Sequence, residues 1–98
     1  MKGFLVFSGT SPVLFLTTYP DLEDERVLTK LKHKGINKFI AFEVPVDKAR
    51  ERYGARFEAI AEELKGVEDL RVLDYNGDHA FGCFHFDEMG EPIRHELG

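Results

Sequence analysis

Two short apolar runs near the N-terminus have the composition of paired β-strands. Phe4–Phe7 and Val13–Thr18 are rich in β-branched and aromatic residues, and the turn-forming residues Ser8–Pro12 separate them. Pro20 and Asp21 follow as further turn residues. The pattern predicts a β-hairpin.

The segment from Asp21 to Gly35 has the charge pattern of a helix. Its acidic residues come first and its basic residues last, an order that the helix dipole favours, and the glycine marks the end of the helix. The charged residues that show this order are Glu23, Asp24, Glu25, Lys30, Lys32 and Lys34.

A second helix is predicted from about Asp47 to Lys65, with Gly66 as its stop signal. Apolar residues recur there at helical spacing, namely Ala49, Tyr53, Phe57, Ile60, Ala61 and Leu64. Gly54 lies inside this segment, and an interior glycine costs a helix about 1 kcal/mol relative to alanine. We therefore expect a kink or a break near Gly54.

The last third of the chain has the pattern of a strand meander. Leu70–Tyr75 and His79–Phe86 flank the Asn76-Gly77 dipeptide, which favours the type I′ turn of a two-residue hairpin. Glu91–Glu96 is expected to return as a short strand at the edge of the sheet, because its proline cannot donate to a central ladder.

The predicted elements follow the order β-β-α-β-α-β-β-β and form one α+β domain over residues 1–98. Ile36–Val44 is apolar on both of its faces, which is typical of a central strand that is covered on both sides. Right-handed crossovers would place both helices on one face of a mixed sheet of about five or six strands. The fold class is thus a two-layer sandwich.

Two helices on one face would leave the other face of an apolar sheet uncovered. Phe4 and Val6 alternate with Leu5 and Phe7, so the first strand is apolar on both faces. A bare face of this kind exceeds the apolar surface that a soluble monomer normally exposes. A homodimer that packs through this sheet face is therefore expected, and a strongly curled, barrel-like sheet that covers itself is the alternative.

Charge is divided unevenly along the 98 residues, whose formal net charge is −5. Residues 26–56 hold nine basic and three acidic side chains, and residues 68–98 hold two basic and eight acidic side chains. An acidic protein does not attract nucleic acid or an anionic membrane by its overall field, so neither is an expected partner.

Two features predict a cytoplasmic protein. The chain has a single cysteine, and its apolar runs are far shorter than the ~20 residues of a membrane span.

One candidate for catalysis is a carboxylate beside an imidazole. The predicted two-residue turn would place Asp74 directly opposite His79, with the Cβ atoms about 5 Å apart. A carboxylate raises the pKa of a neighbouring imidazole and fixes its tautomer, as a general base requires. Cys83 on the same strand is a further candidate, as a nucleophile with His85 or His79 as its base, and packing in the core as a small apolar residue is the alternative. The alternative is an ordinary hairpin-stabilising pair, because no nucleophile or oxyanion donor is evident beside it.

The same strand could also suggest a metal site, since His79, Cys83 and His85 share one face. A rise of about 3.3 Å per residue separates the two histidines by about 20 Å, so they cannot share an ion. Cys83 and His85 lack further ligands at the spacings of zinc sites. We expect no metal and no cofactor.

The basic residues of the two predicted helices form stripes with four-residue spacing. Arg26, Lys30 and Lys34 make the first stripe. If it faces the acidic flank of the second helix, which carries Asp47, Glu51 and Glu58, then the second helix's own basic stripe lies on the outer edge. That stripe consists of Lys48, Arg52 and Arg56. It is a candidate site for an anionic small molecule or for an acidic partner, such as the C-terminal third of another copy, and a solvated helix face is the alternative.

These patterns favour a small noncatalytic binding or regulatory module that self-associates. The alternative is a small hydrolase- or isomerase-like enzyme that uses the His79/Asp74 pair. No motif has the specificity of a phosphate-binding loop or a zinc knuckle, so the sequence does not name an activity or a ligand.

Overall fold

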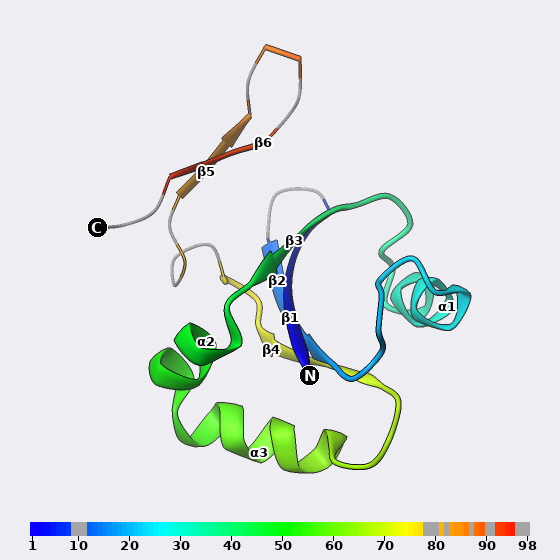
Figure 1. The fold of residues 1–98 in the computed structure, drawn as a ribbon. Coiled ribbons are helices and arrows are strands. Elements are labelled where there is room, and N and C mark those ends of the chain that lie inside the picture. The colour runs from blue at the N-terminus through cyan, green and yellow to red at the C-terminus, as the bar shows by residue number, and fades with distance from the viewer. Residues whose placement is uncertain (9–11, 78–80, 82, 87, 90–91, 96–98) are drawn as a thin grey trace.

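Four strands pair into one antiparallel sheet at the centre of the computed structural model (Figure 1). The structure describes residues 1–8, 12–77, 81, 83–86, 88–89 and 92–95. The strands are β1 (Lys2–Phe7), β2 (Pro12–Thr17), β3 (Ile40–Val44) and β4 (Leu70–Asp74), in the spatial order β3-β1-β2-β4. The predicted N-terminal hairpin is confirmed, with Val6 opposite Val13.

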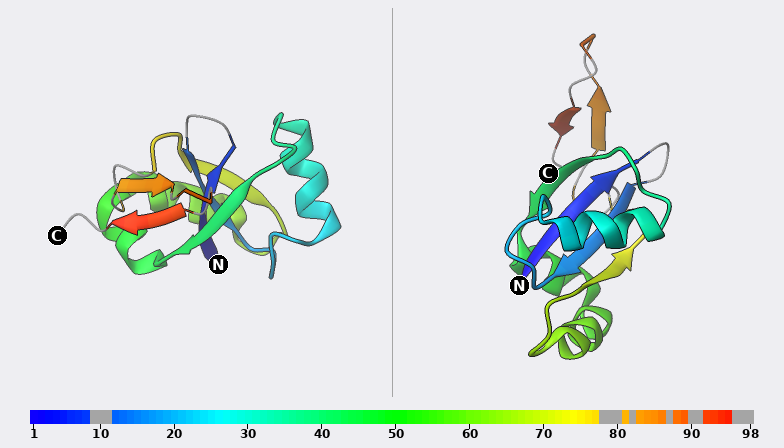
Figure 2. Two further views of the ribbon diagram at one scale, coloured as in Figure 1. Left: turned by 90° about the horizontal axis from the view of Figure 1, so that it is seen from above. Right: turned by 90° about the vertical axis from the view of Figure 1, so that its right-hand side faces the viewer.

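Helices cover both faces of this sheet (Figure 2). On one face lies α1 (Glu25–His33), whose buried Val27 and Leu31 pack with Val6 and Phe15. On the other face lie α2 (Val46–Tyr53) and α3 (Ala55–Leu64). These two helices contribute Ala49, Phe57 and Leu64 to a core that also contains Leu5, Leu14 and Leu16.

The prediction of two helices on one face is therefore wrong. The α1 connection crosses the sheet from β2 to the β3 edge, and the α2–α3 connection returns from β3 to the β4 edge. The rule of right-handed crossovers applies only to the first connection, because β2 and β3 are parallel whereas β3 and β4 are antiparallel. The second connection is therefore free to lie on the other face. The chain itself thus covers the apolar residues on both faces. The homodimer stays a prediction, but this sheet face is not open to serve as its interface.

The predictions for the sheet itself also need correction. Each strand pair is antiparallel, so the four-stranded sheet is not mixed. The predicted central strand over Ile36–Val44 is shorter and lies at the edge as β3. Residues 36–39 stay outside the strand, and Ile36 and Phe39 pack against the core beside α1.

The segment after β4 does not form the predicted type I′ hairpin. β4 pairs with β2, and Gly77 lacks the positive φ that such a turn requires. Gly77 instead lies against the core, where an added Cβ would stand 2.7 Å from Leu5 Cδ1 and 2.9 Å from Leu14 Cβ. Strands β5 (Cys83–Phe86) and β6 (Pro92–His95) pair with each other in a separate two-stranded sheet.

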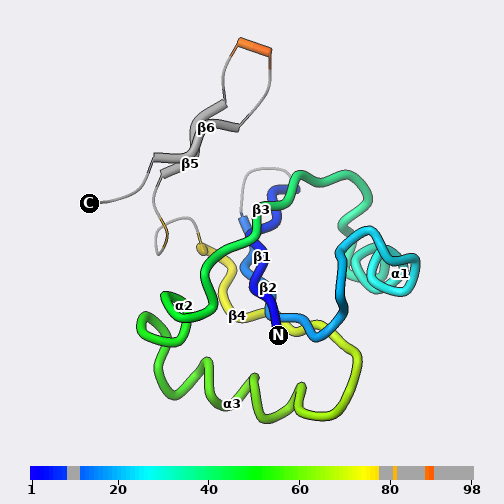
Figure 3. The backbone as a smooth tube through the Cα atoms, viewed as in Figure 1, coloured from blue at the N-terminus to red at the C-terminus, as the bar shows by residue number. Residues whose placement is uncertain are grey.

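The predicted break in the second helix is confirmed at Gly54, where the backbone trace turns between α2 and α3 (Figure 3). Gly54 has φ +50, a conformation that glycine adopts without steric cost. The C-terminal end of α1 also matches the sequence pattern, whereas the helix begins at Glu25 and not at Asp21. Its N-cap, Asp24, accepts a hydrogen bond from the Arg26 N–H, and Gly35, with φ +83, follows its C-terminus.

Candidate functional site

A hydrogen-bonded pair of side chains joins the end of α2 to the end of β4. The Tyr53 hydroxyl donates to Asp74 Oδ2 at 2.6 Å, and the Asn76 N–H donates to Asp74 Oδ1 at 3.0 Å. The β2–β4 register shifts between Leu14 and Phe15. Such an irregularity changes the direction in which nearby side chains point. Here the Asp74 side chain lies on the face of the sheet that α2 covers.

The surroundings of this pair keep Tyr53 neutral and Asp74 ionised. Burial raises the pKa of Tyr53, and the hydrogen bond to Asp74 raises it further. Burial works against ionisation of Asp74, but the hydrogen bonds from Tyr53 and Asn76 outweigh it and hold the carboxyl pKa below its usual value. The positive charge of Arg56 contributes in the same direction.

Two of the predicted anion-binding residues lie next to this pair. Lys48 and Arg52 belong to α2 and Arg56 belongs to α3, so the helix break at Gly54 divides the stripe. All three side chains are exposed. Arg52 and Arg56 both lie within electrostatic range of the Tyr53 hydroxyl. Their positive charges favour the ionised form of Tyr53 and so act to lower its pKa, against the larger effects of burial and Asp74. We call these three residues the basic corner.

Three arginines outside the basic corner are paired with carboxylates. Arg26 pairs with Asp24 and Glu68, Arg71 pairs with Asp69 and Glu63, and Arg50 pairs with Asp47 and Glu58. By contrast, no carboxylate within the described parts of the chain forms an ion pair with Arg52, Arg56 or Lys48.

The expected pairing between the two helices is wrong. Arg26 and Lys30 of the first basic stripe contact the segment before β4, and the Lys30 ammonium lies 3.1 Å from Asp69. They do not meet Asp47 or Glu58, because α1 and α2 lie on opposite faces of the sheet. Lys34, the third member of the stripe, has no carboxylate partner in the part of the chain that the structure describes.

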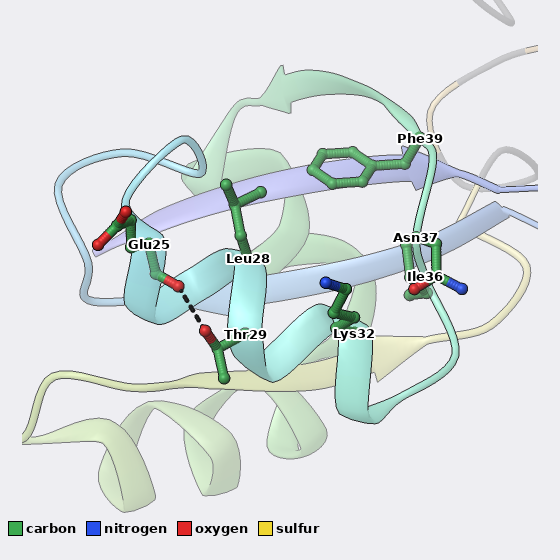
Figure 4. Close-up of a pocket in the computed structure, with 7 residues that line it drawn as sticks. All are labelled: Glu25, Leu28, Thr29, Lys32, Ile36, Asn37 and Phe39. Carbon is green, nitrogen blue, oxygen red and sulfur yellow. Dashed lines mark hydrogen bonds between the residues drawn. The ribbon is translucent and has the colours of Figure 1, made fainter.

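A second surface, which the sequence did not indicate, lies beside α1. A groove of about 470 Å³ runs between this helix and the segment that leads into β3 (Figure 4). Leu28, Ile36 and Phe39 supply its apolar wall, and Lys32 lines it as well. Leu28 is 41% exposed, although its neighbours Val27 and Leu31 are fully buried. We call this surface the α1 groove.

Of the candidate catalytic pair, the structure describes Asp74 alone. Asp74 ends β4 and accepts a hydrogen bond from Tyr53, and the type I′ turn that would have set it opposite His79 does not form at Asn76-Gly77. His79 lies outside the described residues, as do the side chains of Cys83 and His85. Within the residues that are described, no group of three or more His, Cys, Asp or Glu side chains gathers as metal ligands do.

A scan against protein-family models and searches of curated proteins and of solved structures each found no match for this chain. Among its described helices, none is both long and apolar enough to span a membrane. The basic corner and the α1 groove are thus the two candidate binding surfaces of the described residues.

Proposed function

We propose that this protein is a noncatalytic binding module whose basic corner holds an anionic group of its ligand or partner. One observation carries the proposal: Arg52 and Arg56 are exposed and have no ion-pair partner among the described residues, whereas Arg26, Arg50 and Arg71 are paired.

An unpaired guanidinium group keeps its donors for an incoming acceptor. Its planar fork matches a carboxylate or a phosphate and binds either through two parallel hydrogen bonds. In a chain of net charge −5, attraction to an anion must come from a local cluster of this kind. Lys48 adds a third positive charge on the adjacent helix.

The Tyr53–Asp74 pair supports this role for the corner. Both Asp74 oxygens accept hydrogen bonds, one from Tyr53 and one from Asn76, and within the described residues Asp74 forms no ion pair with Arg52 or Arg56. The bond also attaches Tyr53, the last residue of α2, to the sheet. This attachment lies between Arg52 and the helix break at Gly54. No contact of the described residues favours the enzymatic alternative, which stays a prediction.

Pyrophosphate is a suitable probe, because it offers several anionic oxygens to two guanidinium groups. Titration followed by ¹H–¹⁵N NMR should shift the amide signals of residues 52–57, and Arg52→Glu/Arg56→Glu should abolish those shifts. The matched control is Lys34→Glu/Lys38→Glu, which changes the net charge equally and replaces exposed lysines elsewhere. Wild-type protein that shows no shifts at millimolar pyrophosphate would overturn the proposal, and so would equal losses in both double variants.

A further inference from the structure

The α1 groove has an acidic end, an apolar centre and a basic end, and a second, antiparallel copy of α1 matches all three. We propose that the groove is a homodimer interface in which α1 of a second copy lies antiparallel to α1 about a two-fold axis. The Leu28 side chains of the two copies meet at this axis, and Glu25 of each copy pairs with Lys32 of the other. This contact is independent of the basic corner.

The apolar centre of the groove is formed by α1 and by the segment that follows it. Leu28 is 41% exposed, whereas Val27 and Leu31 of the same helix are fully buried. Ile36 and Phe39 are half-buried and line the groove together with Leu28. Figure 4 shows Phe39 across from Leu28. Solvent contact of large apolar side chains around one depression is typical of an interaction site.

The two charged ends of the groove lie on the same face of α1 as Leu28. Glu25 lies in the first turn of the helix and Lys32 in the last, and both line the groove. Residues three, four and seven positions apart share one face of a helix, so Leu28 lies between two opposite charges (Figure 4). Both charged side chains are exposed, and neither forms an ion pair within the part of the chain that the structure describes.

The opposite flank of α1, by contrast, is paired within the chain. Arg26 contacts Asp24 and Glu68, and Lys30 contacts Asp69. On the groove side, one carboxylate and one ammonium group remain for another molecule. Because the two charges are opposite, the groove favours neither a purely acidic nor a purely basic occupant. It favours an apolar surface that carries the same two charges in reverse order.

A second copy of α1 has this surface when it runs antiparallel to the first. Leu28 lies three residues after Glu25 and four residues before Lys32. With a rise of ~1.5 Å per residue, Glu25 lies about 4.5 Å from the axis and the partner's Lys32 about 6 Å from it in the same direction. The long lysine side chain spans this small difference. The same ion pair forms on both sides of the axis, as the symmetry of an isologous dimer requires. Parallel helices would instead place like charges together.

The expected dimer is weak. Its central element, α1, has nine residues, so the contact area is at the low end of protein interfaces, and exposed ion pairs contribute little each. The dimer should therefore dissociate on dilution, and added salt should weaken it further.

Sedimentation equilibrium from micromolar to millimolar protein measures this association. The mean mass should rise from 11.2 kDa toward twice that value with increasing concentration. Glu25→Lys and Lys32→Glu each place like charges at both ends of the contact, so each variant alone should dimerise about tenfold more weakly or worse. An equimolar mixture of the two variants should associate as the wild type does, because each copy then carries the charges that the other needs.

The charge-matched controls are Glu62→Lys and Lys65→Glu, at exposed positions of α3 and its C-cap. They change the net charge by the same amounts and should leave the association unchanged. Both reversals in α1 oppose the helix dipole, so circular dichroism should first show that each variant keeps its helices. Leu28→Ser changes no charge and therefore tests the contact by a second route. It should also weaken the dimer about tenfold, because it removes the apolar centre from both copies.

Three results would overturn this interface: a wild-type monomer at millimolar concentration, a dimer that Leu28→Ser leaves unchanged, or charge variants that do not associate when mixed. The basic corner can fail separately. Lys32→Glu leaves Arg52 and Arg56 in place, so this variant should still bind pyrophosphate. Arg52→Glu/Arg56→Glu should in turn leave the dimer intact, because those side chains extend from the helices on the other face of the sheet.

Discussion

The hydroxyl of Tyr53 lies 2.6 Å from Asp74 Oδ2 and joins the last residue of α2 to the last residue of β4. Because the helix breaks at the next residue, Gly54, this bond attaches the end of α2 to the sheet at the point where the helical hydrogen bonds stop. Tyr53 also lies between Arg52 and Arg56 in the chain. The position of the basic corner therefore depends on a contact made by neither arginine.

Replacement of Tyr53 by phenylalanine should destabilise the fold. The substitution removes a donor from a partly buried, ionised carboxylate, and hydrogen bonds to charged groups contribute about 1.5–3 kcal/mol. Urea denaturation at pH 7 should show a loss of about 1–2 kcal/mol in the free energy of unfolding, since Asp74 retains the Asn76 bond. Tyr75→Phe is the control, because Tyr75 is 62% exposed, and it should have little effect.

The same pair should make the fold sensitive to alkaline pH. Burial and the Asp74 bond raise the pKa of Tyr53 above its ordinary value of 10.0, so the folded state favours the neutral phenol. This contribution is fully present below pH 10 and is lost as the pH rises through the folded pKa. Unfolding experiments from pH 8 to pH 11 should show a shallower alkaline decline for Tyr53→Phe than for Tyr75→Phe. Parallel declines would contradict this assignment.

Gly77 should tolerate no side chain, because its backbone packs on the central hairpin. A Cβ there would approach Leu5 Cδ1 to 2.7 Å and Leu14 Cβ to 2.9 Å. Overpacking of this kind typically costs about 1–3 kcal/mol, so Gly77→Ala should lower the urea midpoint accordingly. The control is Gly35→Asn, where no atom lies within 4 Å of an added Cβ and asparagine tolerates positive φ. Equal effects of the two substitutions would argue against the close approach.

Local patterns predicted the elements better than their arrangement. The β1–β2 hairpin, the C-terminal end of α1 and the break at Gly54 follow from turn residues, charge order and backbone freedom, which act within a few residues. Strand order depends on contacts between distant segments. The pattern over 36–44 did not reveal that Ile36 and Phe39 pack against the core beside α1 before β3 begins. Gly77 illustrates the same limit, since contact with Leu5 and Leu14 determines its conformation.

The candidate sites were only partly visible in the sequence. The spacing of Lys48, Arg52 and Arg56 indicated the basic corner, but Tyr53 looked like an ordinary apolar helix position. A buried tyrosine needs a partner for its hydroxyl, and this requirement was the available signal. Its partner could not be identified, because Asp74 reaches α2 only after a register shift in the sheet. The α1 groove was hidden for a similar reason, since Leu28 looks as apolar as Val27 and Leu31.

Asp69 should account for part of the acid sensitivity of the fold. Its side chain is 17% exposed and contacts Lys30 of α1 and Arg71 of β4, and it accepts the Leu70 N–H at 2.8 Å. Burial opposes ionisation, but these hydrogen bonds outweigh it and lower the pKa of the carboxyl below its ordinary value of 3.8. The contribution to stability is thus present above about pH 4 and is lost as the pH falls through the folded pKa.

Asp69→Asn should therefore lower the free energy of unfolding by about 1–2 kcal/mol at pH 7, and the difference from wild type should shrink steadily between pH 4 and pH 2. Urea denaturation at each pH measures this difference. Glu62→Gln serves as the control, since Glu62 is exposed and forms no ion pair with any residue in the described segments. A difference between Asp69→Asn and wild type that stays constant down to pH 2 would show that the ionised carboxylate does not link α1 to β4.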